Sequence, residues 1–258
     1  MAAGDAPRED RRGVLVTGGS RGIGRVIART FAEQGDRVAV HWGSSADAAE
    51  QVLAGLPGAG HVLVQADLAD AGAVGAMVDR AAADLGRLDV LVNNAAVATK
   101  TPPLTTSYAE WQAVWSRTLA VNLVGAANAT FRAVPHLIAA GGGAVVNVSS
   151  RGAFRGEPDN PAYGASKAGL NAFAQSMALA LAPHGISVTC VAPGYVQTEK
   201  AREVLDGPGG DAVRAQSPFG RVATPAEVAS AVLWLASPGA RFSSGTVVDV
   251  NGASYLRT

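Results

Sequence analysis

Short apolar runs alternate with longer segments of helical periodicity along almost the whole chain. Runs of this length that end in glycine or polar residues are typical of buried parallel strands. We predict strands at residues 13–17, 37–42, 61–65, 88–92, 144–148, 186–191 and 246–250. We predict helices at 23–34, 46–56, 71–84, 108–119, 121–140, 161–182 and 225–236, with Asp70 and Thr224 as caps and residues 199–217 irregular. The alternation predicts an α/β fold, a doubly wound, mostly parallel seven-stranded sheet with helices on both faces.

The chain contains no linker, repeat or low-complexity segment. Residues 1–12 are polar and predicted to form a flexible N-terminal tail, and residues 13–258 a single catalytic domain. In such sheets ligands bind beyond the carboxyl ends of the strands, so the loops after the strands are the candidate site. The Gly- and Pro-rich segment 199–218 is expected to be a lid over the substrate.

Composition excludes several kinds of partner. The 21 acidic and 21 basic residues balance, and neither a basic excess nor a basic stripe indicates nucleic acid or an anionic membrane. One cysteine permits neither an internal disulfide nor a cysteine-based metal cluster, and the spacing of His41, His61 and His136 predicts no metal site. No apolar stretch is long enough for a membrane span or a signal peptide, so we expect a soluble cytoplasmic protein.

A glycine-rich loop, residues 17–24 (Thr-Gly-Gly-Ser-Arg-Gly-Ile-Gly), joins the first predicted strand to the first helix. Glycines permit a tight turn and a close approach of the backbone to a pyrophosphate. The helix N-terminus behind them offers free N–H groups and a positive dipole end. The alternative is a plain glycine-rich turn in a chain with 31 glycines.

This loop resembles the opening of the short-chain dehydrogenase/reductase family, and further motifs of that family follow at matching places between about residues 12 and 254. The resemblance implies a Rossmann-type fold, a nicotinamide cofactor and hydride transfer between a carbonyl and an alcohol. Ala96 departs from the family's usual glycine. The cofactor-binding residues expected from these motifs, with Arg21 and Ser44 added on chemical grounds, are Gly18, Ser20, Arg21, Gly22, Ile23, Gly24, Ser44, Asp67, Leu68, Asn94, Ala95, Tyr163, Lys167, Pro193, Gly194, Val196 and Thr198.

The end of the second predicted strand favours NADP(H) over NAD(H). NAD-binding relatives carry an acid there for the ribose hydroxyls, whereas this chain has Trp42, and its next acid is Asp47 in the following helix. Without a carboxylate to repel it, a 2′-phosphate has room. Arg21 suits phosphate geometry, and Ser44 or the serine after it could donate a further bond; a solvated loop cation is the alternative for Arg21.

The predicted helix 161–182 contains Tyr163 and Lys167, whose spacing places both side chains on one face. A nearby ammonium favours the phenolate and is expected to lower the pKa of Tyr163. The resemblance makes these two residues, Ser150 and Asn122 a catalytic tetrad. Ser150 would position the substrate oxygen, Tyr163 would be the acid/base, Lys167 would hold the cofactor ribose, and Asn122 would support proton supply. Turn chemistry for Ser150 and a satisfied core amide for Asn122 are the alternatives.

We therefore predict an NADP(H)-dependent oxidoreductase that interconverts a small ketone or aldehyde and an alcohol. Arg151 and Arg155 could bind an anionic substrate or be solvated loop cations. The nearest subgroup resembles the 3-oxoacyl-carrier-protein reductases, but the two docking positions fall on Gly141 and His184, and neither is Arg or Lys. A catalytically silent NADP-binding sensor is the alternative from another class. The resemblance implies a homotetramer with interfaces at 108–140 and 225–255; a dimer or a monomer is the alternative.

Overall fold

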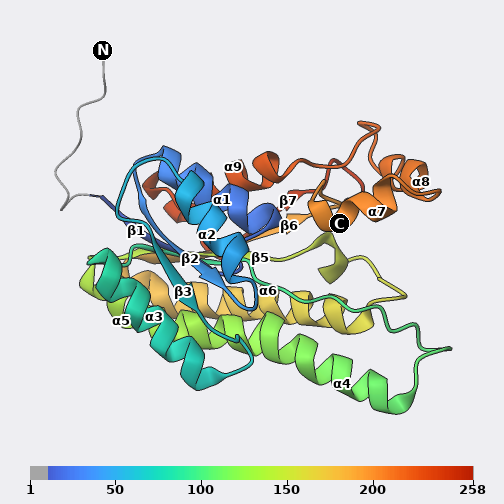
Figure 1. The fold of residues 1–258 in the computed structure, drawn as a ribbon, viewed down its shortest axis with the longest axis horizontal. Coiled ribbons are helices and arrows are strands. Elements are labelled where there is room, and N and C mark those ends of the chain that lie inside the picture. The colour runs from blue at the N-terminus through green and yellow to red at the C-terminus, as the bar shows by residue number, and fades with distance from the viewer. Residues whose placement is uncertain (1–10, 258) are drawn as a thin grey trace.

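The computed structural model describes residues 11–257 (Figure 1), so most of the predicted tail, residues 1–10, lies outside the described residues. Arg12, which the prediction assigned to the tail, is bound to the domain. Its guanidinium pairs with the Asp36 carboxylate at 2.7 Å and donates to the Ala236 carbonyl at 3.0 Å.

Seven parallel strands form one sheet in the order β3-β2-β1-β4-β5-β6-β7. The strands are β1 (Gly13–Val16), β2 (Arg37–Trp42), β3 (Val62–Gln65), β4 (Val90–Asn93), β5 (Gly143–Val148), β6 (Ile186–Pro193) and β7 (Val247–Val250). Val16 of β1 lies beside Val40 of β2 on one side and Val92 of β4 on the other. The strand order therefore reverses at β1, which places a crevice beyond the carboxyl ends of β1 and β4. The predicted doubly wound sheet is confirmed, and every pairing is parallel.

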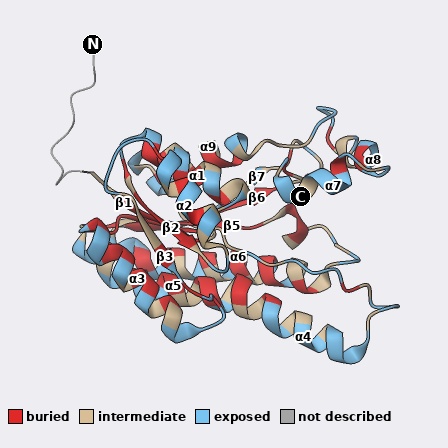
Figure 2. Cartoon of the chain, in the orientation of Figure 1, coloured by how far each residue is buried: buried red, intermediate tan, exposed pale blue. Residues whose placement is uncertain are grey.

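Helices cover both faces of the sheet (Figure 1). One face packs α1 (Gly22–Glu33), α2 (Ala46–Gly55) and α9 (Pro225–Leu235), and the other packs α3 (Ala71–Leu85), α5 (Ala126–Ala139) and α6 (Pro161–Leu181). α4 (Tyr108–Leu119) packs against α6. Successive strand residues serve opposite faces: Leu15 belongs to the core cluster under α3, and its neighbours Val14 and Val16 belong to the cluster under α1. Figure 2 shows the buried strands between these two layers.

Two predicted helix starts have the expected caps. The Asp70 carboxylate accepts the N–H of Ala73 at 3.0 Å, and Thr224 forms a capping box with Glu227 ahead of α9.

Short helical turns lie at η2 (Arg151–Ala153), η3 (Ala182–His184) and η5 (Pro238–Ser243). Among residues 11–257, no helix is both long and apolar enough to cross a membrane.

Two segments differ from the prediction. The helix expected at 121–140 opens as a π-helical turn, η1 (Ala120–Gly125), before α5 begins. The segment predicted to be irregular contains η4 (Glu199–Ala201), α7 (Arg202–Leu205) and α8 (Gly210–Arg214). These helices are too short to show a periodic apolar pattern. They are held instead by the buried Leu205 side chain and by Arg214, which donates to the Leu205 carbonyl at 2.8 Å.

Candidate active site

A cavity of about 870 Å³ opens at the carboxyl ends of the strands, beside the point where the strand order reverses. It brings together most of the predicted cofactor residues: Gly18, Ser20, Arg21, Gly22, Ile23, Gly24, Ser44, Asn94, Ala95, Tyr163, Lys167, Pro193, Gly194, Val196 and Thr198. Ser150 lines it as well. Asp67, Leu68 and Asn122 do not line it.

The glycine loop forms a cradle at one end of this cavity. Gly18 has φ +63° and Gly22 φ +51°, a backbone region that strongly favours glycine. A Cβ atom at Gly24 would lie 2.1 Å from the Gly18 carbonyl oxygen, so α1 approaches the loop too closely for any side chain there. The Asn94 amide donates to the carbonyls of Thr17 at 2.9 Å and Gly18 at 3.2 Å. The loop is therefore fixed in the shape that a dinucleotide phosphate requires, and the residues present fit such a group.

His41 of β2 supports the same loop from below, a contact that the sequence analysis missed. Its Nδ1 accepts the N–H of Gly18 at 2.9 Å, and its own backbone carbonyl accepts the N–H of Gly19 at 2.8 Å. Because Nδ1 is an acceptor, the proton is on Nε2, which donates to the Ala66 carbonyl at 3.1 Å. The ring is 2% exposed, and burial lowers the pKa of His41. The imidazole is therefore neutral and connects the loop to β2 and to the end of β3.

The end of β2 presents no carboxylate to the cavity. Ser44 and its neighbour Ser45 line the cavity there, together with the exposed Arg21 at the start of α1. The nearby Arg25 is paired with Glu199, whereas Arg21 lines the same cavity as the two serines. This group of side chains suits a phosphate monoester.

Tyr163 and Lys167 stand one turn apart on α6. The Lys167 Nζ atom lies 5.8 Å from the centroid of the Tyr163 ring and donates to the Val148 carbonyl at 2.7 Å. The Ser150 hydroxyl forms a hydrogen bond with Tyr163 and accepts the N–H of Gly152 at 3.0 Å. The end of β5 and the first turns of α6 thus gather an ammonium, a phenol and a hydroxyl at one wall of the cavity.

Burial sets the proton affinities of this group. It lowers the pKa of Lys167 to about 8, because the side chain is 2% exposed and no carboxylate contacts it. Burial also raises the pKa of Tyr163; the Ser150 hydrogen bond opposes this rise and the charge of Glu157 adds to it. The sequence analysis predicted that Lys167 would lower the pKa of Tyr163. The structure gives the opposite direction, because the amine is bound to Val148 beside the ring and desolvation of the phenolate dominates.

The Asn122 side chain has hydrogen-bond partners in the core, and its role in proton supply stays a prediction. It donates to the Val97 carbonyl at 2.9 Å and to the Ser166 hydroxyl at 3.1 Å, and it accepts the N–H of Val97 at 2.8 Å. These bonds join the π-helical turn η1, the loop after β4 and α6. Asn122 therefore reaches the reactive wall through Ser166, the neighbour of Lys167.

Three other predicted positions lie as follows. Asp67 is exposed, accepts the N–H of Ala69 at 3.0 Å and pairs with Arg117 at 2.9 Å. Leu68 is buried in the core cluster under α3. Among the described residues, the one non-glycine residue with positive φ is Ala253, so Ala96 stands in place of the family's glycine without backbone strain.

A parallel sheet that carries a phosphate cradle at its switch point, next to a phenol, an ammonium and a hydroxyl, defines a dinucleotide-dependent oxidoreductase. Comparison with known proteins places the chain in a family. The family model described as enoyl-(acyl carrier protein) reductase matches residues 18–253. The chain belongs to the short-chain dehydrogenase/reductase family.

Two curated relatives and one solved structure are similar to this chain over nearly its whole length. The chain is 40% identical to a cis-4-hydroxycyclohexanecarboxylate dehydrogenase from Sinomonas cyclohexanicum, over 93% of this chain and 95% of that protein. It is 35% identical to a 3-oxoacyl-(acyl-carrier-protein) reductase from Staphylococcus aureus, over 95% and 98% of the two chains. A short-chain dehydrogenase from Burkholderia cenocepacia, solved in complex with NADP, superposes with a TM-score of 0.83 at 33% identity, covering 94% of this chain and 97% of that one.

Proposed function

We propose that this protein is an NADP(H)-dependent oxidoreductase that interconverts a small ketone or aldehyde and an alcohol, with Tyr163 as the acid/base. The observation that carries the proposal is the convergence of Ser150, Tyr163 and Lys167 in the cavity that also holds the glycine cradle. A bound nicotinamide would supply or accept the hydride. Everything else in the reaction falls to side chains of this chain.

In the direction of reduction, the Tyr163 hydroxyl gives its proton to the substrate oxygen as negative charge develops there. The Ser150 hydroxyl, already in hydrogen-bond contact with Tyr163, holds that oxygen. In the direction of oxidation, Tyr163 takes the proton back. Lys167 would hold the ribose hydroxyls of the cofactor. Its pKa of about 8 leaves the amine mostly protonated at neutral pH.

The choice of NADP(H) over NAD(H) rests on Arg21 and Ser44 at the cavity and on Trp42 at the position where a ribose-binding acid would stand. The Burkholderia relative contains NADP, which supports the same choice. Glu199 does not oppose it, because its carboxylate is paired with Arg25.

Substrates are expected among small ketones and secondary alcohols, the chemistry that the name of the Sinomonas relative describes. Reduction of 3-oxoacyl groups on a carrier protein is the second candidate, supported by the Staphylococcus relative. The predicted docking positions do not favour it, because neither Gly141 nor His184 is the Arg or Lys that would contact an acidic carrier protein. A binding measurement with acyl carrier protein distinguishes the two.

We also propose a homotetramer. Large apolar side chains are exposed in both segments expected to form interfaces: Phe131 of α5 is 76% exposed, Trp234 of α9 is 50% exposed, and Phe242 is fully exposed. Sedimentation of the purified protein tests the assembly.

The activity is tested by following NADPH and NADH oxidation with a panel of ketones that includes 4-oxocyclohexanecarboxylate. Ketone reduction that is faster with NADPH than with NADH supports the proposal. Failure to reduce any ketone, or a clear preference for NADH, contradicts it.

A further inference from the structure

Arg151 directly follows Ser150 and begins the short turn η2. It is 6% exposed, although its side chain carries a full positive charge. One of its nitrogens, Nη1, donates to the Ser254 hydroxyl at 2.7 Å. Within residues 11–257, no ion pair joins Arg151 to a carboxylate. A guanidinium is seldom buried without an anionic partner, because its desolvation is costly.

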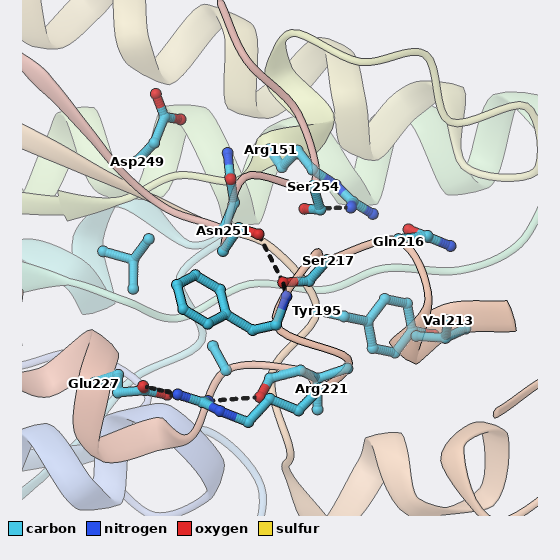
Figure 3. Close-up of a pocket in the computed structure, with 15 residues that line it drawn as sticks. Arg151, Tyr195, Val213, Gln216, Ser217, Arg221, Glu227, Asp249, Asn251 and Ser254 are labelled. Carbon is cyan, nitrogen blue, oxygen red and sulfur yellow. Dashed lines mark hydrogen bonds and ion pairs between the residues drawn. The ribbon is translucent and has the colours of Figure 1, made fainter. Parts of the chain in front are cut away.

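The Arg151 side chain lies between two cavities. It lines the large cavity that contains Ser150 and Tyr163, and it also lines a smaller cavity of about 190 Å³ beneath residues 213–219. Figure 3 shows Arg151 beside Ser254 at the edge of this smaller cavity, with Gln216 on the same side. Tyr195 is shared by both cavities as well. A molecule that places its reacting oxygen on Ser150 is therefore in the same cavity as the Arg151 side chain.

The charges around Arg151 do not cancel. Burial and the neighbouring Arg155 lower the pKa of Arg151, whereas the charges of Glu157 and Tyr195 favour its protonated form. Glu157 forms no ion pair with either arginine. The Arg155 guanidinium is held at 3.0 Å by the neutral amide oxygen of Gln216. The charge of Arg151 is therefore not offset by an ion pair with a neighbouring carboxylate.

We infer that Arg151 binds a carboxylate of the substrate, so that the enzyme acts on small hydroxy acids and oxo acids in preference to neutral alcohols, ketones and polyols. The guanidinium would donate to the carboxylate through N–H groups other than the one bonded to Ser254, in the paired geometry that suits both planar groups. The inference rests on the proposed function and specifies that the substrate carries a negative charge. Of the two readings left open by the sequence for Arg151, it selects anion binding over a solvated loop cation.

The direct test compares two ketones that differ in one charge, 4-oxocyclohexanecarboxylate and its methyl ester, with NADPH as the reductant. We expect wild-type protein to favour the acid at least ~10-fold in kcat/KM, the range of one charged hydrogen-bond pair. Arg151→Met should reduce this acid-to-ester ratio by ~10- to 100-fold. Arg151→Lys keeps the charge but loses the two-pronged guanidinium geometry, so its acid-to-ester ratio should lie between those of the wild-type protein and Arg151→Met. Arg155→Met, the matched control, should keep the ratio within about threefold.

Binding gives a readout that does not depend on turnover. With NADP⁺ present, cyclohexanecarboxylate should raise the melting temperature of the wild-type protein more than cyclohexanecarboxamide does, and Arg151→Met or Arg151→Lys should reduce that difference. Equal use of acid and ester by the wild-type protein, or an unchanged carboxylate effect in the variants, overturns the inference. The proposed function would then survive, provided the ketones are reduced. If neither ketone is reduced, the proposed function fails for these substrates, and the binding measurement alone decides the role of Arg151.

Discussion

The Nδ1 atom of His41 accepts the backbone N–H of Gly18 at 2.9 Å, which joins β2 to the glycine loop proposed to hold the dinucleotide phosphates. The ring is buried and its other nitrogen is occupied by the Ala66 carbonyl. A protonated imidazole has two donors and no acceptor, so protonation breaks the bond to Gly18. The neutral state of one histidine is therefore required for the loop geometry.

Acidification should weaken cofactor binding through His41. Burial depresses the folded-state pKa of His41 below its ordinary value of 6.5, so the unfolded chain binds the proton more readily. Stability from the neutral ring is complete above about pH 6.5 and is lost progressively as the pH falls below it. We expect the free energy of unfolding to fall as the pH drops below about 6.5, and the affinity for NADPH to fall only at the lower pH at which the folded protein itself takes up the proton.

His41→Asn retains an acceptor and removes the titration, so it should flatten this pH dependence. His184→Gln, which changes an exposed histidine, is the control and should leave it as in the wild-type protein. NADPH fluorescence and chemical denaturation measured at several pH values provide the data. An equally steep pH dependence in His41→Asn would show that another group is responsible.

The buried Lys167 amine should lower the free energy of unfolding, although the proposed reaction requires it. A pKa lowered from 10.5 to about 8 corresponds to ~3 kcal/mol against the charged amine, partly offset by its bond to Val148. Because the folded state holds this proton less tightly than the unfolded state, stability should rise with pH between about 8 and 10.5. Lys167→Met should stabilise the fold at pH 7 by about 2 kcal/mol, abolish that rise and greatly reduce turnover.

Urea denaturation at pH 7 and pH 10 measures both effects of Lys167→Met. Lys200→Met, at an exposed position near the cavity, is the matched control and should change stability by less than ~0.5 kcal/mol. A less stable Lys167→Met protein would mean that the buried amine contributes favourably to folding.

Ala253 has φ +57°, a backbone conformation that favours glycine. Removing the Cβ atom relieves this strain, so Ala253→Gly should raise the free energy of unfolding by about 1 kcal/mol. Ala96→Gly is the matched control, because Ala96 has no positive φ and its replacement should bring no gain. Thermal denaturation of the two variants decides the point; equal effects would contradict a local strain at Ala253.

Arg21 should determine the cofactor preference. Loss of its guanidinium removes a charge-assisted contact to the 2′-phosphate, so Arg21→Met should raise the KM for NADPH by ~10- to 100-fold and leave the KM for NADH nearly unchanged. Arg25→Met removes a cation one turn later on α1 that is already paired with Glu199, and it should affect NADPH far less. Parallel losses with NADPH and NADH in Arg21→Met would show that the residue does not contact the 2′-phosphate.

The order of strands and helices was predictable because most strands are short buried apolar runs and several long helices have a periodic apolar face. The glycine loop and the Tyr163–Lys167 pair were predictable because their spacing is local. The contacts of His41 and Asn122 were not, because both bind backbone groups at least 23 residues away. The helices between Glu199 and Arg214 escaped prediction because each is shorter than the period needed to recognise it. The direction of the Tyr163 pKa shift depends on burial, which spacing along a helix does not show.

The proposed reaction depends above all on proton transfer by Tyr163. Tyr163→Phe keeps the ring against Lys167 and removes only the hydroxyl, whereas Tyr195→Phe does the same for the other phenol of the cavity. Steady-state NADPH oxidation, combined with NADPH binding by fluorescence, compares the two variants. We expect Tyr163→Phe to bind NADPH as the wild-type protein does but to lose at least ~100-fold in kcat, while Tyr195→Phe keeps at least about a tenth of the wild-type kcat. Turnover by Tyr163→Phe at the wild-type rate would rule out proton transfer by Tyr163.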